Sequence, residues 1–519
     1  MRRRSFLKIG SIASAVPLLG SAVSARGPFD VKVPEPYDQV GSEPGDPTSP
    51  VFHRHPLELD TLKRQAERAE SDSAPKRKYH PVLSRKLADG FADGTSNLLV
   101  TTVGERAQIR SKGSYKREIN GWTAKAAEIE RLSEFGEVAF APKFASTKVN
   151  LHGVTRDEVA DLAELPFVLE VNYDPEFSDD DAGTETHAND DVGIESHETK
   201  NVLREPGYLR FDMVEDDYNI PLGMKIGIID RGYEGDGGRF STAWAEEVGI
   251  DEFRAEDFAD DWDDPESDHG DNVANTAAFF TQPQGHSNLF VPLRRDSDEA
   301  SAGIRAAIEY AEEWDMEVIN MSFGWDPEDE DGGWEPEGTC PSILCDLLDS
   351  YTDAGYIPVA STGNEGYTTK VNHPGTDYFS VSVGMAHGNC HVDDDEVFQR
   401  RYNSNYGTIM YEDPFEGVTY CHYCNNEGSV TQFMPDVYGY SPFGVDGGRE
   451  SVGGTSNAAP QVAAAALILQ SNDVFDLGEA HEIFRGMDLF GICPTDDDHP
   501  DPAREGQLLD ALEALEESS

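Results

Sequence analysis

Residues 453–469 read Gly-Gly-Thr-Ser-Asn-Ala-Ala-Pro-Gln-Val-Ala-Ala-Ala-Ala-Leu-Ile-Leu. A glycine-rich entry leads into Val462–Leu469, which has no polar face. A helix that is apolar on all sides has to be buried, so this stretch predicts a helix inside a large core. A serine at the entry to such a helix is ordinarily an N-cap.

The chain around this helix alternates between short apolar strands and helical patterns from about residue 206 onward. Ala302–Glu313 has an amphipathic helical spacing. The alternation predicts an α/β fold, a parallel sheet with helices on both faces, whose functional residues lie at the carboxyl ends of the strands. The predicted strands are Lys225–Ile229, Val318–Met321, Ile357–Ala360 and Phe379–Val383.

The length and net charge of the chain limit the classes of function that it can have. The chain has 519 residues, room for about three domains. Its 99 acidic and 41 basic residues give a net charge of −58, which excludes a nucleic-acid binder with a basic surface and argues against adhesion to anionic membranes. The acids are spread along the whole chain rather than gathered in a disordered tail, so the excess predicts a halophilic protein.

Lysine is unevenly distributed, which indicates a boundary near residue 200, because only Lys225 and Lys370 follow it. At the N-terminus, residues 2–8 read Arg-Arg-Arg-Ser-Phe-Leu-Lys before a weakly apolar run, and 1–25 resemble a twin-arginine signal peptide. The alternative is an uncleaved anchor, which Pro17 and the short apolar run disfavour. We therefore expect a secreted protein with no stable membrane anchor.

The remaining N-terminal sequence divides into three parts. Residues 26–93 are rich in Pro and charge and are predicted to be poorly ordered, and residues 177–205 are an acidic linker. Residues 94–176 have the β-α-β-β-α-β order of a ferredoxin-like fold, with a capping box at 155–158. Its predicted elements are Asn97–Val103, Thr123–Ser133, Val138–Ala141, Lys148–Leu151, the helix opened by the capping box, and Phe167–Val171.

The six cysteines all follow residue 300, within the predicted α/β domain 206–519 and its irregular acidic insertion around 387–434. In an exported protein they can form disulfides, with 15 possible connectivities, or remain as buried thiols. Cys390-His391 and the Cys-x-x-Cys at 421–424 leave a zinc site open as an alternative.

Four polar sites follow strands or precede helices, and each has an ordinary structural interpretation. Asp230 could be a turn residue, His269 a structural histidine at a helix start, Asn364 a left-handed turn residue between glycines, and Ser456 an N-cap.

Taken together, the order Asp, His, Asn, Ser resembles that of the subtilisin-like serine proteases. The resemblance covers about 206–516. Its motifs are Asp230-Arg231-Gly232, His269-Gly270-Asp271-Asn272-Val273-Ala274, Gly363-Asn364-Glu365-Gly366, Gly454-Thr455-Ser456-Asn457-Ala458-Ala459-Pro460, Pro435-Asp436-Val437 and the predicted closing helix Gly506–Leu515. Residues 94–176 are similar to the family's inhibitory propeptide, which implies a partner in cis.

The resemblance implies a serine endopeptidase acting on protein or peptide substrates. Ser456 would be the nucleophile, His269 the general base, Asp230 the group that orients the imidazole, and Asn364 an oxyanion donor. By the same resemblance the substrate pocket is lined by Ser322, Phe323, Gly324, Ala360, Ser361 and Gly363. No cofactor is needed for this chemistry, although structural calcium is common in the family.

Departures from the family pattern place new groups beside the histidine. Arg231 replaces a small residue, and Asp271 and Asn272 replace Thr and His, so we expect an altered working pH. Two other function classes stay open: a pseudo-protease kept as a binding module, and an exported metalloenzyme using His373, His391, His422 and the cysteines.

Overall fold

The computed structural model describes part of the chain. The predicted signal peptide, the segment 26–93, the linker 177–205 and Arg231 lie outside the described residues. The described residues are 94–113, 116–174, 224–230, 256–257, 269–281, 289–294, 300–324, 343–364, 371–375, 380–392, 395–400, 404–405, 410–412, 419–421, 435–440, 454–472, 477–486, 492–493, 509, 511 and 514.

Residues 94–174, which we call the N-terminal unit, form an antiparallel sheet with strand order β4-β5-β1-β6 and two helices. The predicted β-α-β-β-α-β order is present. At the predicted capping box, Glu158 Oε2 accepts from the backbone N–H of Thr155 at 3.0 Å and from its Oγ1 at 2.6 Å. The elements are β1 Thr95–Thr102, α3 Ala126–Leu132, β4 Glu137–Phe140, β5 Lys148–Thr155, α4 Arg156–Glu164 and β6 Val168–Tyr173.

A hairpin that the sequence analysis missed interrupts this order. Strands β2 (Glu105–Arg110) and β3 (Glu118–Thr123) pair with each other outside the four-stranded sheet. The helix predicted from Thr123 therefore begins three residues later, at Ala126. Gly121 permits the hairpin to approach its neighbour, because a Cβ there would lie 1.8 Å from the Phe144 carbonyl oxygen.

A second, larger sheet has the order β17-β13-β12-β11-β10-β7-β9-β8, with β16 paired to β12. Every strand pair from β8 through β12 is parallel, as is the pair β12–β16, which confirms the predicted α/β class. Its strands are β7 Lys225–Asp230, β8 Glu256–Asp257, β9 Leu289–Arg294, β10 Val318–Met321, β11 Ile357–Ser361, β12 Val381–Val392, β13 Asp395–Arg400, β16 Val437–Tyr440 and β17 Ile492–Cys493.

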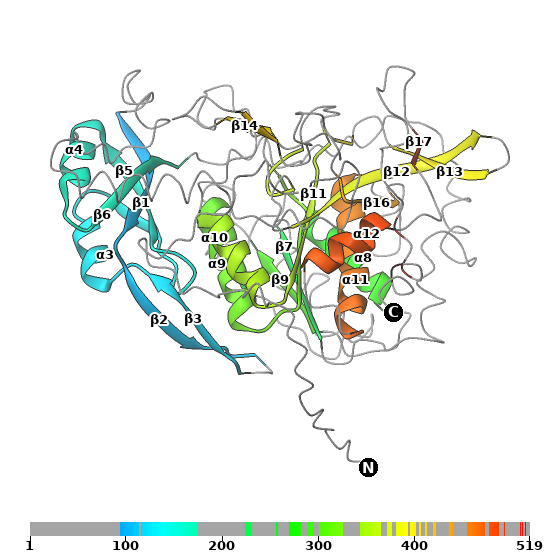
Figure 1. Cartoon of the computed structure of the whole chain (residues 1–519), viewed down its shortest axis with the longest axis horizontal. Coiled ribbons are helices and arrows are strands. Elements are labelled where there is room, and N and C mark those ends of the chain that lie inside the picture. The colour runs from blue at the N-terminus through cyan, green and yellow to red at the C-terminus, as the bar shows by residue number, and fades with distance from the viewer. Residues whose placement is uncertain are drawn as a thin grey trace, which may run out of the picture.

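Helices cover both faces of this sheet (Figure 1). Helices α8 (His269–Thr281), α11 (Thr455–Ser471) and α12 (Leu477–Gly486) share one buried cluster with Ile226 and Ile228. All residues of α11 from Thr455 to Gln470 are buried, as its apolar sequence predicts, and each fully buried Val, Leu or Ile contributes about 1.5–3 kcal/mol.

Helices α9 (Ala300–Glu313) and α10 (Ile343–Asp353) cover the opposite face and lie between the large sheet and the N-terminal unit (Figure 1). Their core cluster includes Ile229 and Ile319 from the sheet and Leu99 from β1 of the N-terminal unit. Leu99 therefore joins the N-terminal unit to this cluster, although the unit also has a core of its own that includes Leu98, Val100 and Leu151.

The insertion predicted to be irregular at 387–434 is partly regular. Strand β12 continues to Val392 and pairs antiparallel with β13, while β14 (Met410–Glu412) pairs with β15 (Thr419–Cys421). Of the predicted closing helix, only Leu509, Ala511 and Ala514 are described, and all three are buried. Within the described part of the chain, no helix has the length and apolar character needed to cross a membrane.

Candidate active site

Asp230 and His269 meet at the carboxyl edge of the large sheet. Asp230 is the last residue of β7 and is 1% exposed, and His269 is the first residue of α8. The His269 ring nitrogen Nδ1 lies 2.7 Å from Asp230 Oδ1. Because a carboxylate can only accept, this contact places the proton on Nδ1 and directs the basic Nε2 away from Asp230.

Ser456 lies in the first turn of α11, which packs against α8. Its Oγ donates to the carbonyl of Ser322 at 3.3 Å, and the Ser322 hydroxyl donates to the carbonyl of Ser456 at 2.8 Å. Asn320 Nδ2 in turn donates to the Ser322 hydroxyl at 2.9 Å. These bonds fix the start of α11 against the end of β10.

This support was not predicted from the sequence. Ser322 was predicted to line the substrate pocket, and Asn320 was predicted only as part of the strand Val318–Met321. The available signal was the two-residue spacing, because residues i and i+2 of a strand point to the same side.

Asn364 follows β11 and contacts the residues just before Ser456. Its Oδ1 accepts from the backbone N–H of Thr455 at 2.9 Å and from the Thr455 hydroxyl at 3.1 Å. Because these two bonds hold the carbonyl oxygen of the Asn364 amide, its Nδ2 is the atom that can donate. Thr455 was not predicted as a functional residue, although the Gly-Thr-Ser motif contains it.

Gly454 has the backbone conformation that leads into this contact. Its φ of +135° lies in the region that favours glycine, and a Cβ there would lie 3.6 Å from Asn364 Oδ1 and 3.7 Å from Nδ2. The Asn364 amide therefore lies close to the backbone that leads into Ser456.

The residues predicted to line the substrate pocket follow the neighbouring parallel strands β10 and β11. Phe323 and Ala360 pack into the core cluster beneath α9 and α10, so only their backbones could contact a substrate. The Ser361 hydroxyl donates to the Phe323 carbonyl at 3.4 Å, which joins the two strand ends. Their predicted role in binding substrate stays a prediction. All six are buried: Ser322, Phe323, Gly324, Ala360, Ser361 and Gly363.

The metal hypothesis gains no support from the described residues, among which no three His, Cys, Asp or Glu side chains group around a possible ion. His373 is 3% exposed, and burial lowers its pKa to about 3, so it is neutral. Cys345 of α10 is disulfide-bonded. The side chains of His391, His422, Cys390, Cys421 and Cys424, and those of Asp271 and Asn272, lie outside the described residues.

Comparison with models of protein families identifies the family of this chain. The model of the subtilase family matches residues 222–483, just over half of the chain, and the span contains Asp230, His269, Asn364 and Ser456. The chain belongs to the subtilase family. This subtilase is therefore a hydrolase of the serine peptidase type.

Solved structures similar to this subtilase include two maturation proteases. The prenylagaramide maturation protease PagA is 17% identical with a TM-score of 0.37, and the match covers 60% of this chain and 98% of that one. The patellamide maturation protease PatA is 20% identical with a TM-score of 0.36, covering 57% and 96%. No curated protein sequence matches the chain.

Proposed function

We propose that this subtilase is a secreted endopeptidase that cleaves protein or peptide substrates through Ser456, His269 and Asp230. The observation that carries the proposal is the 2.7 Å contact between His269 Nδ1 and the buried Asp230 carboxylate. It lies at the sheet edge where parallel α/β folds hold their functional groups, beside the helix that begins with Thr455-Ser456.

In the proposed reaction, the Ser456 hydroxyl leaves the Ser322 carbonyl and turns to His269 Nε2, which removes its proton as Oγ attacks the substrate carbonyl. Asp230 stabilises the imidazolium that forms. The imidazolium then protonates the leaving amine, and a water activated by the same histidine hydrolyses the acyl-enzyme.

The developing oxyanion would be stabilised by Asn364 Nδ2 and by the backbone N–H of Ser456. The positive end of the α11 dipole adds to this field. The bonds from Thr455 to Asn364 Oδ1 support this assignment, because they orient the donor before the substrate arrives.

Two assays in molar salt test the proposal. Purified protein should hydrolyse casein and should react with a serine-directed fluorophosphonate, and Ser456→Ala should lose both properties. Ser471→Ala is the matched control, because Ser471 lies at the opposite end of the same helix. If the protein hydrolyses casein but does not react with the fluorophosphonate, and if chelation abolishes the hydrolysis, it is a metalloenzyme. Neither hydrolysis nor labelling would indicate a pseudo-protease.

We expect Asn364→Ala to lower kcat by about 10²–10³, typical of removing one oxyanion-hole donor in a protease of this kind, with a smaller change in KM. Initial-rate kinetics on a peptide substrate measure both constants. Asn472→Ala, at the end of α11, is the matched control. An unchanged kcat for Asn364→Ala would remove Asn364 from the proposed site.

We further propose export by the twin-arginine route and an inhibitory role in cis for the N-terminal unit, cut away within the linker 177–205. A charge-rich acidic linker between two folded units is a suitable site for cleavage. If the cut is autocatalytic, Ser456→Ala should accumulate uncut after export, as mass spectrometry of the secreted protein would reveal. Normal processing of that variant would mean that another protease makes the cut.

A further inference from the structure

One face of α9 is charged, yet it is buried. Arg305, Glu309 and Glu312, spaced i, i+4 and i+7, lie on that face and are 0%, 2% and 2% exposed. Burying charge is costly unless each group is paired. The partners come from the N-terminal unit, so the polar face of this helix is an interface.

At the first contact, the cation belongs to the catalytic domain. Arg305 donates from its two terminal nitrogens to the two carboxylate oxygens of Asp174, at 2.9 and 2.8 Å. Both side chains are at most 2% exposed. Asn150 also donates to Asp174, and the Asp174 backbone N–H donates to Asn97. This two-point contact, where β6 ends, fixes the carboxylate in one orientation.

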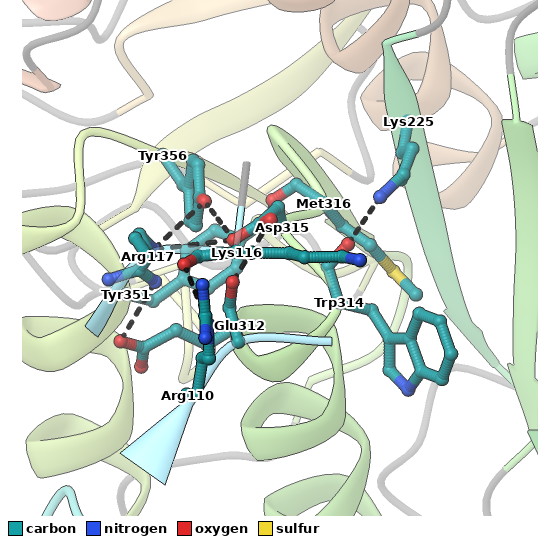
Figure 2. A network of polar contacts seen from close by, with 11 residues as sticks. Arg110, Lys116, Arg117, Lys225, Glu312, Trp314, Asp315, Met316, Tyr351 and Tyr356 are labelled. Atoms are coloured by element: carbon teal, nitrogen blue, oxygen red, sulfur yellow. Dashed lines mark hydrogen bonds and ion pairs between the residues drawn. The ribbon is translucent and has the colours of Figure 1, made fainter. Parts of the chain in front are cut away.

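At the second contact, the cation belongs to the N-terminal unit (Figure 2). Arg117, just before β3, donates to Glu312 at 3.2 Å and to the Tyr356 hydroxyl at 3.2 Å, and it lies 3.4 Å from Asp315. Its guanidinium also lies over the Tyr356 ring, 5.1 Å from the centroid. Burial raises the pKa of Glu312 to about 7 although Arg117 lowers it. The Glu312 side chain is 2% exposed, whereas that of Arg117 is 27% exposed.

Weaker contacts at this end of α9 also join a cation of the N-terminal unit to a carboxylate of the helix. Lys112 Nζ lies 2.8 Å from Glu313 Oε2, and the Lys112 backbone N–H donates to the Glu313 carbonyl. Lys143 Nζ lies 3.4 Å from Glu309. Cations near a helix C-terminus are also favoured by the helix dipole.

We propose that the change from a cation at Arg305 to anions at Glu312 and Asp315 makes docking of the N-terminal unit specific and fixes its register. Arg305 pairs with Asp174 of that unit, and Glu312 and Asp315 pair with Arg117. The inference deepens the proposed function, on which it rests for the inhibitory role of the N-terminal unit.

Alternative registers place like charges together. Arg305 and Glu312 are seven residues apart, about 10 Å along the helix axis. A shift by one turn, about 5.4 Å, would bring Asp174 beside Glu309, and a reversed docking would bring Arg117 beside Arg305. Like charges in contact at a desolvated interface disfavour such arrangements.

Apolar packing alone would not select one docking register over another. Leu99, Phe140 and Ala145 of the N-terminal unit pack against the α9–α10 cluster. Such burial favours association but is non-directional. The charged pairs are therefore the groups that distinguish one register from another.

The test uses the full chain carrying Ser456→Ala, so that proteolysis cannot affect the result. Hydrogen–deuterium exchange is followed in peptides covering β2, β3 and the end of α9. Asp174→Arg alone and Arg305→Asp alone should each speed exchange there at least tenfold, because each leaves a buried charge facing its like. The double variant should restore exchange to within about threefold of the parent.

The charge-reversal variants could fail to fold, so a second pair of variants removes a charge without reversing it. Arg117→Gln should also speed exchange in β2 and β3, whereas Arg131→Gln should not, since Arg131 pairs with Glu134 inside its own unit. Equal exchange in these two variants would overturn the inference, as would single reversals without effect or a double variant that fails to rescue. A processed enzyme, freed of the N-terminal unit, that binds no fluorophosphonate would instead overturn only the proposed function.

Discussion

Replacing Ser456, His269 or Asp230 by alanine is expected to lower kcat for peptide hydrolysis by roughly 10⁴–10⁶, and combining the changes should add little. In the proposed mechanism the three groups act as a unit, because the serine needs the base and the base needs the carboxylate that holds its tautomer. The Asp230–His269 hydrogen bond is the part of this unit already formed in the structure.

The measurement is kcat on a peptide substrate, with thermal unfolding as the control for folding. Asp230 is 1% exposed, so Asp230→Asn is the better variant at that position because it keeps the volume and removes only the charge. Ser471→Ala should keep full activity. Near-normal turnover in Ser456→Ala would contradict the assignment of this serine as the nucleophile.

The sequence predicts the parts of the site that follow from local pattern. Asp230 and Asn364 each follow an apolar strand, and parallel strands place their carboxyl ends at one edge, so their position at this edge of the sheet could be predicted. The hydrogen bond from Ser322 to Ser456 could not. It joins residues 134 positions apart and depends on how closely α11 approaches β10.

The hairpin β2–β3 escaped prediction for a related reason. Ala107 and Ile119 are its buried apolar residues, and they pack against Phe144 from a later segment. The alternating pattern of a strand is therefore weak there. Likewise, the spacing of Ala302–Glu313 predicted which face of α9 is apolar, but it gave no sign that the opposite, charged face would be covered by residues 94–174.

Loss of structure in dilute buffer is the second large effect that we expect. At a net charge of −58, carboxylates repel one another across the folded surface. The Debye length is about 10 Å at 0.1 M salt and about 3 Å at 1 M, so carboxylates separated by distances between these two values repel strongly in dilute buffer and weakly in molar salt. We therefore expect the catalytic domain to unfold or lose activity below roughly molar salt.

Because of the interface on α9, we expect this dependence to differ between the uncut chain and an enzyme processed as proposed. Residues 94–174 contain ten basic and twelve acidic residues, so almost all of the excess negative charge lies elsewhere. In the uncut chain, Glu309, Glu312 and Glu313 are paired with Lys143, Arg117 and Lys112. Removing the N-terminal unit would expose these carboxylates without those cations, so the processed enzyme should need more salt than uncut Ser456→Ala.

Far-UV circular dichroism and peptidase activity measured against NaCl concentration test this expectation, with a parallel series in sucrose. Salt can act by screening or by strengthening hydrophobic burial, whereas sucrose favours burial without screening charge. Rescue by NaCl but not by sucrose would identify repulsion as the limiting effect, and rescue by sucrose alone would identify burial. Full structure and activity of the processed enzyme in dilute, calcium-free buffer would contradict the prediction. An identical salt midpoint for the processed and uncut proteins would show that the α9 carboxylates do not contribute to it.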